Sequence, residues 1–92
     1  MNIVYSPEAI KDLVRLREFI AIKNPSAAKQ MAQSLQLSIQ QLKQFPLMGK
    51  AVDLAPEPEQ IRDLISANYT VRYLIGSEVI YILRVWHQRE DR

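Results

Sequence analysis

The spacing of apolar residues changes along this 92-residue chain from the period of a helix to the period of a strand. Between residues 7 and 42 apolar side chains recur at steps of three and four, the spacing of one buried stripe on an α-helix. From residue 61 to residue 87 the period is two, as in a strand that buries one face. Helices followed by strands are typical of an α+β fold.

Two helices are expected in the first half of the chain, after a short β-like stretch from Asn2 to Tyr5. Ser6-Pro7-Glu8 supplies an N-cap, a proline at the first helical position and an acid near the positive helix end, and this helix should end near Lys23. Asn24-Pro25-Ser26 repeats the start signal, with Asn24 or Ser26 as the cap, and Phe45-Pro46 is expected to end the second helix. So short a connection predicts an antiparallel helical hairpin. Buried stripes are expected from Ala9, Leu13, Leu16 and Ile20 and from Ala28, Met31, Leu35, Ile39 and Leu42, and water-facing positions from Lys11, Asp12, Arg15 and Glu18.

Three strands joined by tight turns are expected in the second half. They span Ile61 to Ser66, Tyr69 to Ile75 and Val79 to His87, with turns at residues 67–68 and 76–77. The whole arrangement is an N-terminal β-strand, the helical hairpin and a three-stranded antiparallel meander (βααβββ), in one domain of residues 1–92. Residues 46–60 are interpreted as a long loop, of a length often found in functional segments, with the charged residues Lys50, Asp53, Glu57 and Glu59.

Strict alternation assigns the strand residues to two faces. The face expected to cover the hairpin holds Tyr69, Val71, Tyr73 and Ile75, and Val79, Tyr81, Leu83, Val85 and His87. The opposite face is expected to expose Leu64, Leu74, Ile80, Ile82 and Trp86. Arg72 and Arg84, joined by Arg62, are expected on that uncovered face, which would suit a carboxylate-rich peptide or a phosphate backbone. Each arginine also has the plainer interpretation of a solvated residue or a partner for a surface acid.

Composition narrows the class of protein. The chain has no Cys, which excludes a disulfide framework and a thiolate nucleophile. Its net charge of +2 is small, so charge alone does not indicate nucleic acid as a partner. No leader segment and no apolar run long enough for a bilayer is found, so the chain is expected to be cytoplasmic with no membrane partner.

The closing strand carries the only His and the only Trp of the chain. A histidine such as His87 can act as an acid or a base near neutral pH, and Arg62 and Arg84 can supply phosphate donors. The remaining acid and base groups of a ribonuclease are sparse, so a structural His bonded to backbone or to an acid such as Asp91 is the alternative. Trp86 can stack on a base or pack against a partner.

Other kinds of site find little support in the residues. A lone His and no Cys give no metal-ligand spacing, so no metal site is expected. The two glycines, Gly49 and Gly76, are both explained by turns and form no phosphate-binding loop. No cofactor is therefore expected.

The order of these segments resembles that of the RelE/ParE toxin superfamily. The resemblance covers the whole chain and rests on Asn24-Pro25, the segment from Phe45 to Gly49, Arg62-Asp63-Leu64, the strand from Tyr69 to Tyr73 and the closing run from Ile82 to Arg89. The pattern His87-x-Arg89 is most similar to the ParE branch. The resemblance implies a toxin of a type II toxin-antitoxin pair, held inactive by a cognate antitoxin.

The branches of that superfamily differ in target. ParE-like members inhibit DNA gyrase, with its A subunit as the expected partner, and have no catalytic reaction of their own. RelE-like members are endoribonucleases that cleave mRNA on the ribosome. We expect a gyrase inhibitor, with the mRNA interferase and a degenerate toxin that only binds its antitoxin as alternatives. The residues expected to bind the target or the antitoxin are Arg62, Arg72, Arg84, Trp86, His87 and Arg89, and those expected to be catalytic in a ribonuclease are His87, Arg62 and Arg84.

Overall fold

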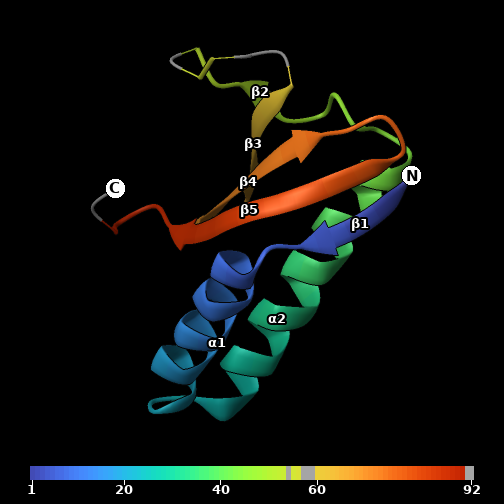
Figure 1. Ribbon diagram of the computed structural model, residues 1–92. Helices are drawn as coiled ribbons and strands as arrows, with labels where there is room; N and C mark the ends of the chain where they lie inside the picture. Colours follow the sequence, from blue (N-terminus) through green and yellow to red (C-terminus); the bar gives the residue numbers. More distant parts are fainter. Residues whose placement is uncertain (54, 57–59, 91–92) are drawn as a thin grey trace.

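The computed structural model describes residues 1–53, 55–56 and 60–90, and the two loop acids Glu57 and Glu59 and the closing Asp91-Arg92 lie outside these ranges. Two helices lie side by side on one face of a sheet (Figure 1). The elements are β1 (Asn2–Tyr5), α1 (Pro7–Ala21), α2 (Pro25–Gln40) with a 3₁₀ turn η1 (Gln41–Lys43), β2 (Lys50–Ala51), β3 (Ile61–Ser66), β4 (Tyr69–Ile75) and β5 (Val79–His87). The expected βααβββ order is confirmed, with one addition: the short strand β2 lies in the segment that we interpreted as a loop.

Both helices begin at the capping residues that the sequence indicated. The Ser6 hydroxyl oxygen accepts a hydrogen bond from the backbone N–H of Ala9 at 3.0 Å, and the Asn24 side chain accepts one from Ala27 at 3.1 Å. Proline follows each cap, where its missing N–H costs no intrahelical bond. These local interactions explain why the helix starts are readable from the sequence.

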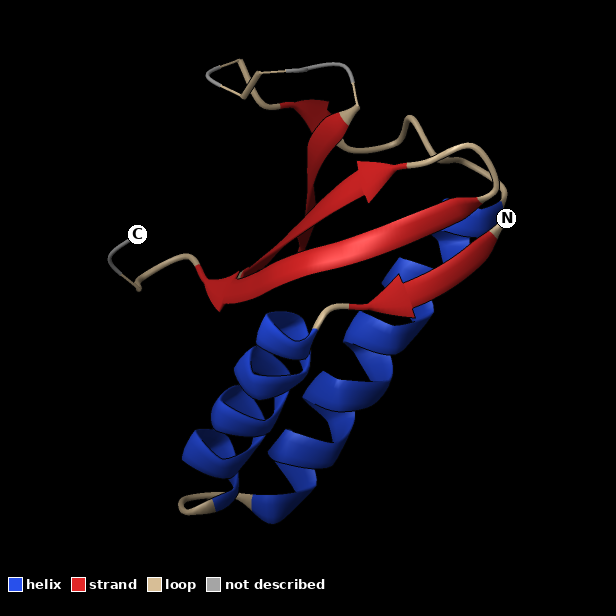
Figure 2. Ribbon diagram, in the orientation of Figure 1, coloured by secondary structure: helices blue, strands red, loops and turns tan. Residues whose placement is uncertain are grey.

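The sheet is mixed, with the strand order β1-β5-β4-β3-β2. The strands β3, β4 and β5 form the expected antiparallel meander, whereas β1 lies parallel to β5 at one edge and the short β2 lies antiparallel to β3 at the other. Both helices cover the same face of the sheet (Figure 2). We call the other face the open face; by register it carries Val4, Asp63, Ile65, Arg72, Leu74, Tyr81, Arg84 and Trp86.

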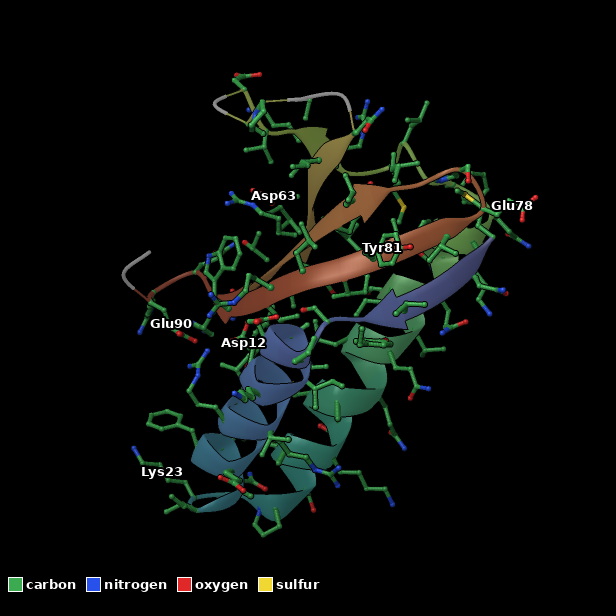
Figure 3. All side chains as sticks on the ribbon, in the orientation of Figure 1. Asp12, Lys23, Asp63, Glu78, Tyr81 and Glu90 are labelled. Carbon is green, nitrogen blue, oxygen red and sulfur yellow. The ribbon has the colours of Figure 1, made fainter. Side chains whose placement is uncertain are left out.

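A bulge in β5 reverses part of the expected facing pattern. Arg72 pairs with Arg84 while Tyr73 pairs with Ile82, so Leu83 is an extra residue in β5. An extra residue exchanges the two faces beyond it, and strict alternation therefore fails across the bulge. The expectation that Tyr81 covers the hairpin is wrong: it is 41% exposed on the open face (Figure 3).

The same shift corrects the other residues assigned by alternation. Val79 and Leu83 alternate with the core residues Ile80 and Ile82 and do not face the helices as expected, whereas Val85, beyond the bulge, does. The predicted apolar patch is wrong in three of its members, since Leu64, Ile80 and Ile82 are buried in the core. The buried core joins both helices to the middle of the sheet and comprises Ala9, Leu16, Met31, Leu35, Ile39, Leu42, Leu64, Val71, Tyr73, Ile80, Ile82 and Val85.

The loop after α2 is fixed to the sheet by Tyr73. The phenol of Tyr73 donates to the Pro46 carbonyl at 2.7 Å and accepts from the Gly49 N–H at 2.9 Å. A Cβ on Gly49 would lie 2.7 Å from the Tyr73 ring, so only glycine permits this close approach. Within the described residues no helix is long and apolar enough to cross a membrane.

Candidate functional site

Cross-strand pairing brings two of the three predicted arginines together. Arg72 and Arg84 are paired neighbours in β4 and β5 and share the open face. Arg62 is opposite Tyr73, so it points to the other face, and Asp63 takes the place beside Arg72 that we expected for Arg62. Arg62 instead donates from one guanidinium nitrogen to the Gly49 carbonyl at 2.9 Å. The predicted cluster of three arginines is therefore wrong.

Arg84 binds a buried carboxylate on α1. Its Nε and Nη2 donate to the two oxygens of Asp12 at 2.8 and 3.0 Å, and the backbone N–H of Val85 donates to the same carboxylate at 2.9 Å. β1 ends beside Ile82, so Arg84 can reach around the edge of β5 to α1. Asp12, which the helical pattern had assigned to water, is only 4% exposed (Figure 3).

The charge of Asp12 is stabilised in spite of its burial. Burial acts to raise the pKa of this carboxyl, but the hydrogen bonds from Arg84 and Val85, together with the charge of Arg84, lower the pKa below its ordinary value. Arg15 adds a longer contact to Asp12, at 3.4 Å. Asp12 is therefore an ionised acceptor that ties α1 to the last strand.

Arg72 is bound to an acid and to an aromatic ring on the open face. Its Nε and Nη2 donate to the two oxygens of Asp63 at 2.8 and 3.0 Å, and its guanidinium carbon lies 5.1 Å from the centre of the Trp86 ring. The hydrogen bond that Arg72 donates to Asp63 is the main cause that raises the pKa of Arg72. Asp63 and Trp86 together hold the guanidinium against the sheet.

His87 lies at a groove between α1 and the end of the sheet. Its ring meets the Tyr69 ring edge to face, with centres 5.2 Å apart, and its Nδ1 accepts from the backbone N–H of Arg89 at 3.1 Å. Glu90 accepts from the His87 backbone N–H at 3.1 Å and from Arg15 at 2.8 Å. The groove has a volume of about 640 Å³ and is lined by Arg15, Leu16, Phe19, Ile20, Tyr69, His87, Arg89 and Glu90.

The sequence prediction missed the carboxylates that bind these arginines. Asp12 follows Ala9 by three residues and precedes Leu16 by four, so its place on the buried stripe was a sign that we did not use. Asp63 stands next to Arg62 in β3 and needs the register to be placed. In the part of the chain that the structure describes, no three His, Asp or Glu side chains gather closely enough to hold a metal ion.

Comparison with known proteins gives the family. The family model of the ParE toxin of the type II toxin-antitoxin system parDE matches residues 3–92. The chain belongs to the ParE toxin family. It is therefore a type II toxin-antitoxin toxin of the RelE/ParE superfamily, and this class of toxin is paired with an antitoxin.

Relatives of this ParE-family chain match it over nearly its whole length. Two toxins of Caulobacter vibrioides, RelE2 and RelE1, are each 27% identical to it: the first match covers 94% of this chain and 93% of the relative, the second 99% and 97%. A solved structure of the chromosomal ParDE TA system from P. aeruginosa is similar with a TM-score of 0.79 at 19% identity, covering 95% of each chain. That likeness supports the βααβββ fold.

Proposed function

We propose that this chain inhibits DNA gyrase in the cytoplasm without a catalytic reaction of its own, and that a cognate antitoxin neutralises it. The observation that supports a non-catalytic action is the engagement of the arginines. Arg72 and Arg84 each give two hydrogen bonds to a carboxylate, and Arg62 binds backbone carbonyls. Guanidinium groups already bound to carboxylates are poor donors for a scissile phosphate, because the bound acids repel it.

The open face supports the antitoxin part of the proposal. Its apolar side chains include Val4, Ile65 and Tyr81, which are 45%, 57% and 41% exposed. Exposed apolar surface rimmed by charge is typical of interaction sites. Asp63 takes two of the five N–H donors of Arg72, and an acidic antitoxin segment can accept from the others.

A supercoiling assay with purified gyrase tests whether gyrase is the target of this toxin. We expect the toxin to block DNA supercoiling and to leave mRNA intact in a translating extract. His87→Ala should change gyrase inhibition by less than about twofold, because no catalytic proton transfer is involved. Arg89→Ala and Trp86→Ala should weaken inhibition if these side chains contact the target. Supercoiling that is unaffected by the wild-type toxin would overturn the proposal.

A ribosome-dependent mRNA interferase is the second candidate, and the groove beside His87 favours it. Tyr69, His87 and Glu90 are groups that can transfer protons, and Arg15 and Arg89 are cations in the same groove. This function predicts mRNA cleavage in the translating extract and a severe loss of cleavage in His87→Ala. Inactivity in both assays, with tight binding to the product of a neighbouring gene, would indicate a degenerate toxin that only binds its antitoxin.

Arg72→Gln tests the antitoxin surface. We expect antitoxin affinity to fall by about tenfold or more, since a buried interface arginine often contributes that much. Lys29→Gln, which removes the same charge from the exposed side of α2, is the matched control and should leave the affinity unchanged. Equal affinity of wild type and Arg72→Gln would place the antitoxin elsewhere, for example on the helical hairpin.

A further inference from the structure

The two edges of the sheet differ in how they are protected against further pairing. One edge is β2, which has only two residues, one of them Lys50. Short edge strands with a lysine are a common protection against edge-to-edge pairing. The other edge is β1, whose four residues, Asn-Ile-Val-Tyr, carry no charge, no proline and no bulge.

Side chains also close the part of β5 that extends beyond β1. Ser6 donates from its hydroxyl to the Leu83 carbonyl at 2.9 Å, Asp12 accepts from Val85 and Glu90 accepts from His87. Each of these bonds engages one outward backbone group of β5. No comparable bond reaches the outer side of β1 from any residue that the structure describes.

The outward peptide groups of β1 belong to Ile3 and Tyr5. Asn2 donates to Glu78 at 3.1 Å and Ser6 donates to Ile82 at 2.9 Å, so these residues direct their N–H groups toward β5. Successive peptide groups of a strand point to opposite sides, so Val4 also points toward β5 while Ile3 and Tyr5 point away from it. The free edge is therefore symmetric about Val4.

We propose that β1 pairs with β1 of a second copy of this chain, antiparallel about a two-fold axis at Val4. Ile3 then lies opposite Tyr5 of the second copy, and the two such pairs form about four backbone hydrogen bonds. Val4 lies opposite Val4 of the second copy on the open face, in the closer, non-hydrogen-bonded kind of pair. The sheets of both copies become one continuous sheet.

The composition of the edge favours a second copy over an unrelated strand. A two-fold axis at Val4 places this residue opposite its own copy and brings the neighbouring residues close to theirs, so a charge at or next to the axis would lie near the same charge of the second copy. β1 has none, and the next residues, Asn2 opposite Ser6, are both neutral. The contact is small, and interfaces below about 1,200 Å² belong to weak complexes, so we expect a dimer at concentrations on the order of 100 µM.

Sedimentation velocity over a range of concentrations tests this pairing. The wild type should shift from monomer to dimer as concentration rises, and its Ile3 and Tyr5 amides should then exchange hydrogen more slowly. Val4→Lys should weaken dimerisation by at least about tenfold, because two lysines would meet at the axis. Val4→Thr, which keeps the β-branched shape without a charge, should still dimerise.

Ile65→Lys is the matched control, because Ile65 is an exposed aliphatic residue on the same face near the opposite edge. It should dimerise like the wild type, and circular dichroism should confirm that all variants are folded. The proposal would be overturned if the wild type stayed monomeric up to about 1 mM, well above the concentration at which we expect the dimer. A dimer that tolerates Val4→Lys, or edge amides that become protected only when antitoxin is added, would also overturn it.

Discussion

Asp12 is the buried carboxylate that ties α1 to β5, and replacing it with alanine should destabilise the protein strongly. Asp12→Ala removes the acceptor of the buried Val85 N–H and the partner of Arg84. A buried donor that loses its acceptor costs about 1–3 kcal/mol. Loss of the ion pair with Arg84 adds only about 1 kcal/mol to this destabilisation, because the Arg84 side chain is 40% exposed and water can replace the carboxylate.

The free energy of unfolding should therefore fall by about 2–4 kcal/mol in Asp12→Ala. For a domain of this size that corresponds to a decrease in Tm of about 10–20 °C. Asp12→Asn keeps one carbonyl oxygen for Val85, so we expect about half of this loss. Both substitutions weaken the attachment of α1 to the end of β5, beside His87 and the groove.

Urea unfolding followed by circular dichroism measures these changes. Glu18→Ala, an exposed acid on the same helix, is the matched control and should stay within about 0.5 kcal/mol of the wild type. A double-mutant cycle of Asp12→Ala with Arg84→Ala should give a coupling of about 1 kcal/mol. A loss below about 1 kcal/mol in Asp12→Ala, or independent effects in the cycle, would refute the role assigned to Asp12.

Three further predictions address pH, the loop after α2 and the bulge in β5. The pKa of Asp12 is lower in the folded protein than its unfolded value of about 3.9, so the stabilisation by ionised Asp12 is complete above that pH and is lost as pH falls through the folded pKa. The stability difference between wild type and Asp12→Asn should therefore be constant from about pH 5 to 8 and shrink below about pH 4. Thermal unfolding in a pH series measures this difference. Tyr73→Phe should cost about 1–3 kcal/mol in urea unfolding, because it leaves the Gly49 N–H and the Pro46 carbonyl without their partner, and an unchanged midpoint would contradict this. Deletion of Leu83 should leave the protein folded, because a regular strand without the extra residue still turns Ile82 and Val85 to the helices and Arg84 to the open face, and loss of the near-ultraviolet circular dichroism signal would contradict this.

The elements were predictable because their signals are local. The caps Ser6 and Asn24 bond to backbone groups three residues away, and proline follows each, so neighbours in the sequence determine where the helices begin. Alternating residues and turns likewise located the strands of the meander. The prediction of which β5 residues face the helices failed at Leu83. Leu83 is an extra residue in β5, and this can be recognised only from the pairing of β5 with β4.

The candidate site was less predictable than the fold. Arg72 and Arg84 were correctly placed side by side, but Arg62 was assigned to the wrong face because the register between β3 and β4 was unknown. The carboxylates that bind the two arginines also escaped prediction. Asp12 lies 73 residues from Val85 in the chain, and no short-range pattern connects two such residues.

The sequence by itself determined the order of the main elements, where the two helices begin, the helical hairpin and the family to which the chain belongs. Only the tertiary structure decided that β1 lies parallel to β5, which residues of β5 face the helices and which acid binds each arginine. The reason is physical: capping and periodicity act over a few residues, whereas register, bulges and buried ion pairs depend on groups that meet only when the sheet closes over the helices.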